Sequence, residues 1–261
     1  RLTRRYTYEI GILIGPEIDI PAPDMYTDEQ VMAWMMDTYS MMKGSAVPGV
    51  VTGKPVCIGG SLGRNKATSA GLVTTVMEAL KYLGIAPNGL SVTVLGFGKV
   101  GYHAAKILYD MGIKVIGVAD SKGALYNPQG IDIDAAFAHK TEHGRLGGYN
   151  GAQEMSIDEL LSVESDVLIP AALEGQIHAG NVGSIKTKIL AEGANNPVTN
   201  EADSVLRKKG VFVIPGILAN AGGVVVSYFE WVQDLQRFFW TEKEINDRLD
   251  SIMIKAFKEV L

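Results

Sequence analysis

The sequence has one cysteine, no long block of basic residues and no long uninterrupted apolar run. Cys57 has no partner for an intrachain disulfide, so nothing indicates secretion. No run of Lys and Arg exceeds three residues and the formal net charge is -5, so we expect no nucleic-acid binding. The longest apolar stretch, residues 216–232, contains Asn220, Ser227 and Glu230, which argues against a membrane span. No signal peptide is visible, and we expect a cytoplasmic location.

The composition is that of a globular protein with a sizeable core. Apolar residues make up 47% of the 261 positions and charged residues 20%. The four histidines lack the spacing of metal ligands, so we expect no metal site. The chain opens with RLTRRYTYEIG, which is typical of a helix already under way, and we expect it to be a truncated protein.

Glycines and capping motifs divide the chain into predicted helices and strands. The run Thr27-Asp28-Glu29-Gln30 predicts a capping box and a helix that continues to Lys43, with Gly44 as its C-terminal glycine. The predicted strands span 91–95, 114–119, 166–170, 188–191 and 211–214, and the later helices span 67–83, 99–111, 131–139, 201–209, 218–233 and 244–261. This alternation indicates an α/β fold: a Rossmann-like, doubly wound, mainly parallel sheet with helices on both faces.

The predicted domain boundary lies near Ser45–Lys54. We expect residues 1–45 to be a remnant and linker of another domain, and residues 46–240 to form a dinucleotide-binding domain. Residues 241–261 are expected to form a C-terminal helix.

A glycine-rich turn between a predicted strand and a predicted helix indicates a phosphate site. The first glycine permits the tight turn, the second lets a pyrophosphate approach the main chain, and the third lets the helix pack closely on the strand. The helix N-terminus then faces the anion. A plain strand-to-helix turn is the alternative interpretation. The predicted site comprises Gly96, Phe97, Gly98, Lys99, Val100 and Gly101.

Asp120 strengthens the case for a dinucleotide site. It ends the next predicted strand, 19 residues beyond Gly101, where a carboxylate accepts hydrogen bonds from the adenosine ribose. A solvated carboxylate at a strand end is the alternative. Its charge disfavours a 2′-phosphate and favours NAD, whereas Ser121 and Lys122 are suited to bind that phosphate. We expect NAD, with NADP as the alternative.

Asp24 follows a proline-stiffened stretch, Pro21-Ala22-Pro23, just before a predicted helix. A carboxylate held rigidly in this way is suited to general acid–base chemistry. On the residues alone, a helix cap is the more frequent role for such an aspartate.

Five segments in order resemble the glutamate dehydrogenases: IPAPDMYTDEQVMAWMMDTYS, PGVVTGKPVCIGGSLGRNKATSAG, LGFGKVG, LAEGANNPVTNEAD and ILANAGGVVVSYFEW. The resemblance covers nearly the whole chain. It implies reversible oxidative deamination of L-glutamate to 2-oxoglutarate and ammonia, with NAD or NADP as coenzyme. Sister dehydrogenases for leucine, valine and phenylalanine share this architecture, but GGVVVSYFEW is more similar to the glutamate enzymes.

The resemblance assigns three residues to the reaction and its substrate. Asp24 matches the aspartate that moves protons to and from the substrate amino group. Ser227 matches a serine that binds the side-chain carboxylate of glutamate; otherwise, it is a hydroxyl bonded to its own helix. Asn220 matches an asparagine beside the nicotinamide ribose and the substrate; otherwise, it is a cap or turn residue.

The resemblance also assigns five residues to the nicotinamide half of the coenzyme. Arg64 and Thr68 match an element that leads toward the nicotinamide. On the residues alone, Arg64 is interpreted as a surface charge and Thr68 as a residue in the first turn of a helix. Ala171, Ala172 and Asn195 match loops that line the same half. On the residues alone, the two alanines are interpreted as packing at a strand end and Asn195 as a turn residue.

One feature departs from the family. The reaction of the family needs a lysine of low pKa and two further lysines in a glycine-rich segment, and no such segment occurs in this sequence. Lys43, Lys54 and Lys66 lie in other motifs, and we expect them to be exposed. We therefore expect this chain to bind coenzyme without turnover. A non-catalytic dinucleotide-binding module, or a leucine, valine or phenylalanine dehydrogenase, remains an alternative. The parent enzyme is expected to be a homo-oligomer, and this chain a monomer or an altered oligomer.

Overall fold

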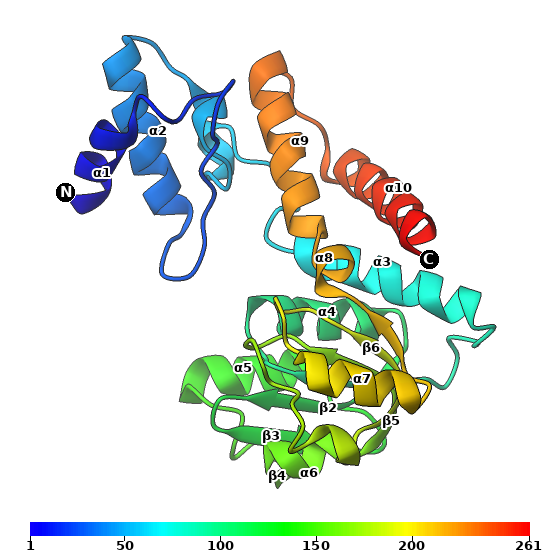
Figure 1. The fold of residues 1–261 in the computed structure, drawn as a ribbon. Coiled ribbons are helices and arrows are strands. Elements are labelled where there is room, and N and C mark those ends of the chain that lie inside the picture. The colour runs from blue at the N-terminus through cyan, green and yellow to red at the C-terminus, as the bar shows by residue number, and fades with distance from the viewer. The chain divides into compact units, whose positions relative to one another are not determined.

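The computed structural model describes residues 1–261, which divide into two compact units (Figure 1). The first unit contains Arg1–Ala67 and Gly223–Leu249, and the second contains Thr68–Gly222 and Asp250–Leu261. This division differs from the expected boundary near residue 45, because residues 46–67 pack with the N-terminal segment. No helix combines the length and the apolar character that crossing a membrane requires.

The second unit is built on a seven-stranded sheet in the order β4-β3-β2-β1-β5-β6-β7. Strands β2, β1, β5, β6 and β7 are parallel, which confirms the predicted doubly wound fold class. The sequence did not predict β3 and β4, which are short and extend one edge in antiparallel fashion. The strands are β1 (Ser91–Leu95), β2 (Lys114–Asp120), β3 (Gly123–Tyr126), β4 (Gln153–Met155), β5 (Glu164–Pro170), β6 (Lys186–Ala191) and β7 (Phe212–Ile214).

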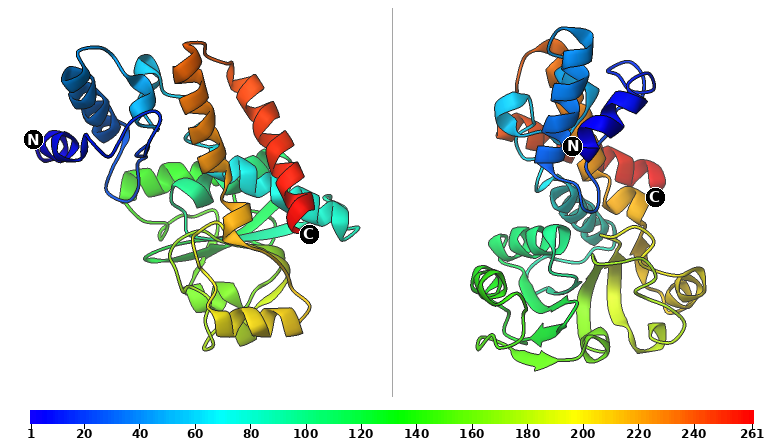
Figure 2. Two further views of the ribbon diagram at one scale, coloured as in Figure 1. Left: turned by 45° about the horizontal axis from the view of Figure 1, so that its top comes forward. Right: turned by 90° about the vertical axis from the view of Figure 1, so that its left-hand side faces the viewer.

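Helices cover both faces of this sheet, as Figure 2 shows. Alternate residues of β1 point to opposite faces. Leu95 packs with Leu160 of α6 and Leu206 of α7, whereas Val94 faces Gly101 of α4. The helices of this unit are α3 (Ala67–Tyr82, its first residue in the first unit), α4 (Lys99–Asp110), α5 (Ile133–His143), α6 (Ile157–Leu161), α7 (Asn200–Lys208) and α8 (Gly216–Ala219), with a 3-10 turn, η3, at Val182–Ser184.

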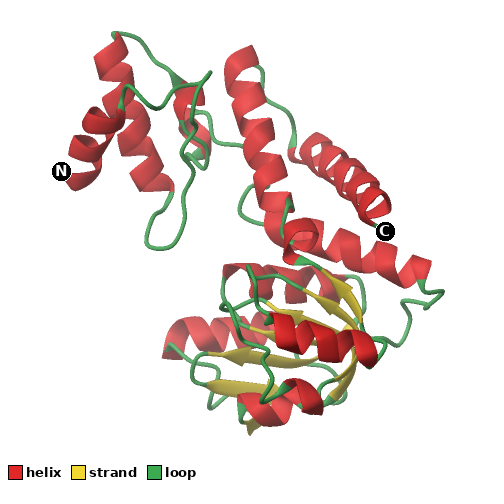
Figure 3. Cartoon of the chain, in the orientation of Figure 1, coloured by secondary structure: helices red, strands yellow, loops and turns green.

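The first unit is mainly helical, as Figure 3 shows. A small core joins Met32, Met35 and Tyr39 of one helix to Val50 and Val51. Its elements are α1 (Leu2–Ile10), α2 (Glu29–Lys43), η1 (Pro48–Val50), η2 (Val56–Ile58), α9 (Gly222–Gln236) and α10 (Glu242–Val260), of which α9 and α10 also contribute residues to the second unit.

Two helix predictions were wrong in their boundaries. The helix expected at 131–139 begins after Asp132, whose side chain accepts from Ala135 N, and continues to His143 before Gly144. The helix expected at 218–233 is divided into α8 and α9, because the chain turns at Asn220. Thr241 and Glu244 form a capping box at the start of α10, since Thr241 N donates to the Glu244 carboxylate and Glu244 N donates to the Thr241 hydroxyl.

The predicted capping box at the start of α2 was also wrong. Asp28, not Thr27, is the N-cap, and its side chain accepts from Val31 N at 2.9 Å. The Thr27 hydroxyl instead bonds to the main chain of Asp24. Gly44 ends the helix with a φ of 72°, as predicted.

Replacing Asp28 with alanine removes the only side-chain cap of α2. We expect Asp28→Ala to lower the free energy of unfolding by about 1 kcal/mol. Gln30→Ala, which disrupts a box built on Thr27, is expected to change it by less than about 0.5 kcal/mol. Urea denaturation measures both variants, and a larger loss for Gln30→Ala contradicts the assignment.

Candidate functional site

The glycine turn lies at the carboxyl ends of the central parallel strands. Leu95 at the end of β1 pairs with Ala119 of β2 and with Pro170 of β5. From β1, the chain winds to β2 on one side and later to β5 on the other. Such a reversal of strand order is the place where open α/β sheets bind ligands.

The three glycines of the turn have different surroundings. Gly96 has a φ of +109°, and a Cβ there would lie 2.8 Å from Ala171 and Ala172. A Cβ on Gly101 would lie 1.7 Å from the Gly96 carbonyl oxygen. A Cβ on Gly98 would meet nothing within 4 Å, and Gly98 is the N-cap of α4 with no side-chain cap. The first-turn amides of α4 therefore adjoin open space, which suits a pyrophosphate.

The other three residues of the turn play different parts. The Phe97 ring is buried and stacks edge-on against Tyr102, so only its main chain is available to a ligand. Its carbonyl oxygen accepts from Lys140 Nζ at 2.7 Å. Lys99 is exposed, and the Val100 carbonyl oxygen accepts from the Ser69 hydroxyl at 2.8 Å.

The Asp120 carboxylate is turned mainly into the protein. Its side chain is 7% exposed, with Oδ1 accepting from Lys122 N at 2.8 Å and Oδ2 from Leu146 N at 3.0 Å. Lys140 Nζ lies 3.8 Å from Oδ2. Ser121, in contrast, is exposed. Asp120 therefore ties the end of β2 to the loop before Leu146, and each oxygen keeps a lone pair for a ribose hydroxyl.

The loops after β5 and β6 meet beside the glycine turn. Ala171 N donates to the Leu95 carbonyl oxygen at 2.7 Å, and Ala172 packs against Gly96. Asn195 Oδ1 accepts from Asn220 Nδ2 at 2.7 Å. Four residues from three separate parts of the sequence thus lie in one unit with the turn: Ala171, Ala172, Asn195 and Asn220.

Asp24 lies in the first unit and is not a helix cap. Its carboxylate is exposed, and Oδ1 accepts only from the adjacent Met25 N at 2.7 Å. The cap of α2 is Asp28. The interpretation of Asp24 as a helix cap is therefore wrong, and its carboxylate is exposed.

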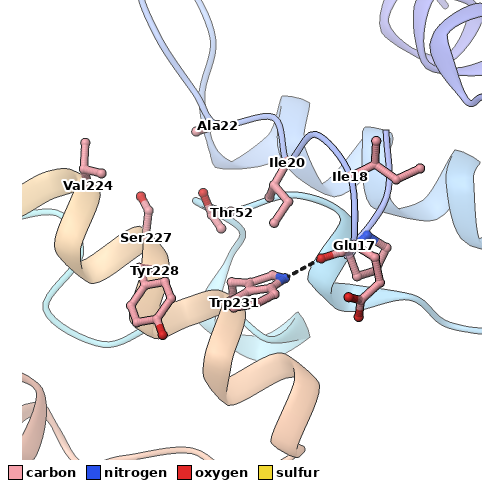
Figure 4. A pocket seen from close by; sticks show the side chains of 10 residues that line it. Glu17, Ile18, Ile20, Ala22, Thr52, Val224, Ser227, Tyr228 and Trp231 are labelled. Atoms are coloured by element: carbon pink, nitrogen blue, oxygen red, sulfur yellow. Dashed lines mark hydrogen bonds between the residues drawn. The ribbon is translucent and has the colours of Figure 1, made fainter. Parts of the chain in front are cut away.

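Ser227 faces a cavity of about 580 Å³ within the first unit (Figure 4). Its hydroxyl donates to the Gly223 carbonyl oxygen at 3.0 Å, so the helix-bonded interpretation is confirmed, while the side chain still lines the cavity. In Figure 4 the hydroxyl oxygens of Ser227 and Thr52 point the same way. The cavity is lined by Pro16, Glu17, Ile18, Ile20, Ala22, Thr52, Val224, Ser227, Tyr228 and Trp231.

Thr52 is a cavity residue that sequence reasoning missed. Nothing in the local pattern identifies it, because the cavity arises from the packing of α9 against two loops that are distant in sequence. The Thr52 amide donates to the Pro21 carbonyl oxygen at 3.0 Å, which aligns this loop with the proline stretch before Asp24.

Arg64 and Thr68 fall in different units. Burial lowers the pKa of Arg64, opposed by the negative charges of Glu230 and Glu29. Arg64 Nε is buried without a hydrogen-bond partner, so this guanidinium keeps an unused donor. Thr68 is partly buried near the start of α3.

The prediction that Lys54 is exposed was wrong. Its side chain is fully buried, and Nζ donates to Val51 O at 2.7 Å, Glu230 Oε1 at 2.6 Å and Asp234 Oδ2 at 2.8 Å. Three acceptors satisfy the three donors of the ammonium group. The signal that sequence reasoning missed is the pair Glu230 and Asp234, four residues apart on an apolar helix, which requires a buried cation.

A Rossmann-like sheet with an open glycine turn at its switch point defines a dinucleotide-binding α/β protein. The Glutamate/Leucine/Phenylalanine/Valine dehydrogenase family profile matches residues 59–261, and the profile of the family's dimerisation domain matches residues 1–41. This chain belongs to that family.

Relatives and solved structures agree with this assignment. The glutamate dehydrogenase of Thermotoga maritima is 51% identical over the whole chain, and a cryptic catabolic NAD-specific glutamate dehydrogenase of Bacillus subtilis is 43% identical. The chain spans 63% and 61% of those proteins. The hetero-hexameric glutamate dehydrogenase of Thermus thermophilus, in a leucine-bound form, superposes with a TM-score of 0.93 at 39% identity, covering 98% of this chain and 61% of that one.

Burial raises the pKa of Asp234 from 3.8 to about 6, although the hydrogen bond and charge of Lys54 oppose it. The folded protein therefore holds this proton more tightly than the unfolded chain. The resulting stability is fully present below about pH 4 and is lost as the pH rises through about 6.

Asp234→Asn removes this titration. We expect the stability of the variant relative to the wild type to rise between pH 4 and pH 6.5 and then to level off, by roughly 1–3 kcal/mol in total, since one pKa unit is worth about 1.4 kcal/mol. Urea denaturation across this pH range measures the difference, with the exposed Asp158→Asn as control. A difference that stays constant or falls with pH contradicts the assignment.

Proposed function

We propose that this chain forms the coenzyme-binding part of a glutamate dehydrogenase, which converts L-glutamate reversibly to 2-oxoglutarate and ammonia. The open main chain at Gly98, at the N-terminus of α4 and at the switch point of the sheet, carries the proposal. The relatives named as glutamate dehydrogenases support the choice of reaction. A bound nicotinamide coenzyme supplies the hydride acceptor.

We propose NAD as the coenzyme. The negative charge of Asp120 at the end of β2 and the NAD-specific name of the Bacillus subtilis relative support this choice. NADP is the alternative, because Ser121 and Lys122 are exposed at the same strand end and Asp120 is already bonded to two amides.

The first unit supplies the groups that handle the substrate in this proposal. Ser227 and Thr52 line an otherwise mainly apolar cavity. On substrate binding, the Ser227 hydroxyl would rotate away from the Gly223 carbonyl oxygen to donate to the side-chain carboxylate of glutamate. Asp24 presents a carboxylate with an unbonded Oδ2, which is suited to move protons at the amino group. Arg64, also in the first unit, keeps an unused donor suited to the coenzyme. Asn220 belongs to the second unit, where its amide is suited to orienting the nicotinamide end.

A leucine, valine or phenylalanine dehydrogenase is the second candidate, because most side chains that line the cavity are apolar. A binding module without catalysis is the third. Initial rates of the intact enzyme that contains this chain, with glutamate, leucine, valine and phenylalanine, together with calorimetric titration of the chain by NAD and NADP, separate the three. Coenzyme binding with preferred oxidation of glutamate supports the proposal. Binding without turnover of any amino acid supports a module.

We also propose that the protein is cytoplasmic and oligomeric. The match of residues 1–41 to a dimerisation domain and the hexameric state of the Thermus thermophilus relative support assembly. Light scattering measures the oligomeric state.

Gly98→Ala tests the pyrophosphate site. Gly98 has ordinary φ and open surroundings, so we expect the variant to fold like the wild type while its methyl group lowers NAD affinity at least tenfold. Gly183→Ala is the matched control, because Gly183 also has open surroundings but lies in η3. Calorimetry measures both affinities, and unchanged binding by Gly98→Ala contradicts the assignment.

Ser227→Ala tests the substrate assignment. Loss of a hydrogen bond to a charged group costs about 1.5–3 kcal/mol, so in the intact enzyme that contains this chain we expect kcat/KM for glutamate to fall by roughly 10-fold to 100-fold. The rate with leucine is expected to stay the same or rise. Ser204→Ala is the control, since Ser204 bonds to its own helix in the same way. Equal losses for both amino acids contradict the assignment of Ser227 to the substrate carboxylate, and an unchanged preference for leucine favours the second candidate.

A further inference from the structure

The Glu230 carboxylate bonds to the main chain of a loop far away in sequence. Its Oε2 accepts from Gly53 N at 2.9 Å, and its Oε1 accepts from Lys54 N at 3.2 Å and from Lys54 Nζ at 2.6 Å. The Glu230 side chain is fully buried. Burying a carboxylate costs stability unless it is paired and hydrogen-bonded, and here both conditions are met.

These bonds join the elements that line the candidate substrate cavity. Thr52, which lines the cavity, directly precedes Gly53, and Ser227 lies three residues before Glu230 on α9. Residues three apart lie on the same side of a helix. The position of the loop against Glu230 therefore determines where Thr52 lies relative to Ser227.

The same loop holds the proline stretch that ends at Asp24. Thr52 N donates to the Pro21 carbonyl oxygen, and a Cβ on Gly53 would lie 2.5 Å from Pro23 Cδ. Gly53 has a φ of +79°, a conformation that other residues rarely adopt. Pro23 therefore packs directly against the main chain of Gly53 and cannot approach it further. The position of the loop that contains Gly53 thus also determines the position of the proline stretch.

Asp234 is part of the same buried cluster but has different contacts. Its Oδ2 accepts only from Lys54 Nζ, at 2.8 Å, and its Oδ1 is buried without a partner. It therefore shares with Glu230 the neutralisation of Lys54, but it makes no bond to the main chain of the loop. The two carboxylates allow the effect of charge to be separated from the effect of loop position.

We propose that Glu230, paired with Lys54, is a positioning residue for the substrate cavity, an inference that rests on the proposed function. Its carboxylate fixes loop 51–54 against α9, so that the hydroxyls of Thr52 and Ser227 face one cavity and the proline stretch before Asp24 is held beside it.

The test compares Glu230→Gln with Asp234→Asn. Each variant removes one negative charge from the surroundings of Lys54 and preserves side-chain volume. The amide nitrogen of glutamine cannot accept a hydrogen bond, so in Glu230→Gln one of the loop donors loses its partner. Asparagine at position 234 leaves every bond to the loop main chain in place.

Two measurements are made at pH 8. In steady-state kinetics of the intact enzyme that contains this chain, with its best amino acid, Glu230→Gln is expected to raise KM at least tenfold while kcat changes less than threefold. Asp234→Asn is expected to change both less than twofold. In amide hydrogen exchange on the full chain, Glu230→Gln is expected to speed exchange at residues 52–54 at least tenfold, whereas Asp234→Asn does not.

Equal effects of the two variants, or no effect of Glu230→Gln on KM and exchange, overturn the proposal and leave a cluster that only stabilises the fold. If Glu230→Gln does not fold, Lys54→Met/Glu230→Gln is compared with Lys54→Met/Asp234→Asn, since each retains one carboxylate. An intact wild-type enzyme containing this chain that oxidises none of the four amino acids refutes the proposed function, and the exchange comparison on the chain then decides the role of Glu230.

Discussion

The close approach of α4 to the end of β1 is the constraint that shapes the glycine turn and the proposed coenzyme site. A side chain at Gly101 would collide with the Gly96 carbonyl oxygen, and one at Gly96 would collide with Ala171 and Ala172. The chain therefore packs the helix N-terminus directly beside the carboxyl ends of β1 and β5. Gly96 and Gly101 are enclosed by neighbouring main chain, whereas Gly98 adjoins open space. The turn is therefore closely packed on one side and open to a ligand at Gly98. In the proposed phosphate site, the binding groups are the main-chain amides and the dipole of α4.

The first unit is organised by buried charge. Lys54, Glu230 and Asp234 have fully buried side chains, and the loop that carries Lys54 also carries the cavity residue Thr52. A buried ion cluster contributes little net stability compared with apolar residues of the same volume, but it bonds in only a few geometries. Main-chain bonds from Gly53 and Lys54 to one carboxylate thus give this unit a defined loop position.

Much of the fold could be predicted from local signals. The parallel strands and the glycine turn were predicted because β-branched runs, capping residues and C-terminal glycines mark them directly. Strands β3 and β4 were missed because they are short and pair only through tertiary context. The cap of α2 was misplaced because Thr27 and Asp28 are both good caps, and only the contacts of Thr27 with Asp24 decide between them. The sequence predicted which candidate residues follow strand ends, because strands and turns are marked locally. The cavity position of Thr52, the contacts of Glu230 and the burial of Lys54 depend on packing between distant segments.

The central claim is that a coenzyme pyrophosphate binds at the N-terminus of α4. A crystal structure of the chain at saturating NAD or NADP tests it most directly. We predict pyrophosphate density within hydrogen-bond distance of the main-chain amides that follow Gly98, with the adenosine ribose beside Asp120 and Ser121. Density elsewhere on the molecule, or none at saturation, contradicts it.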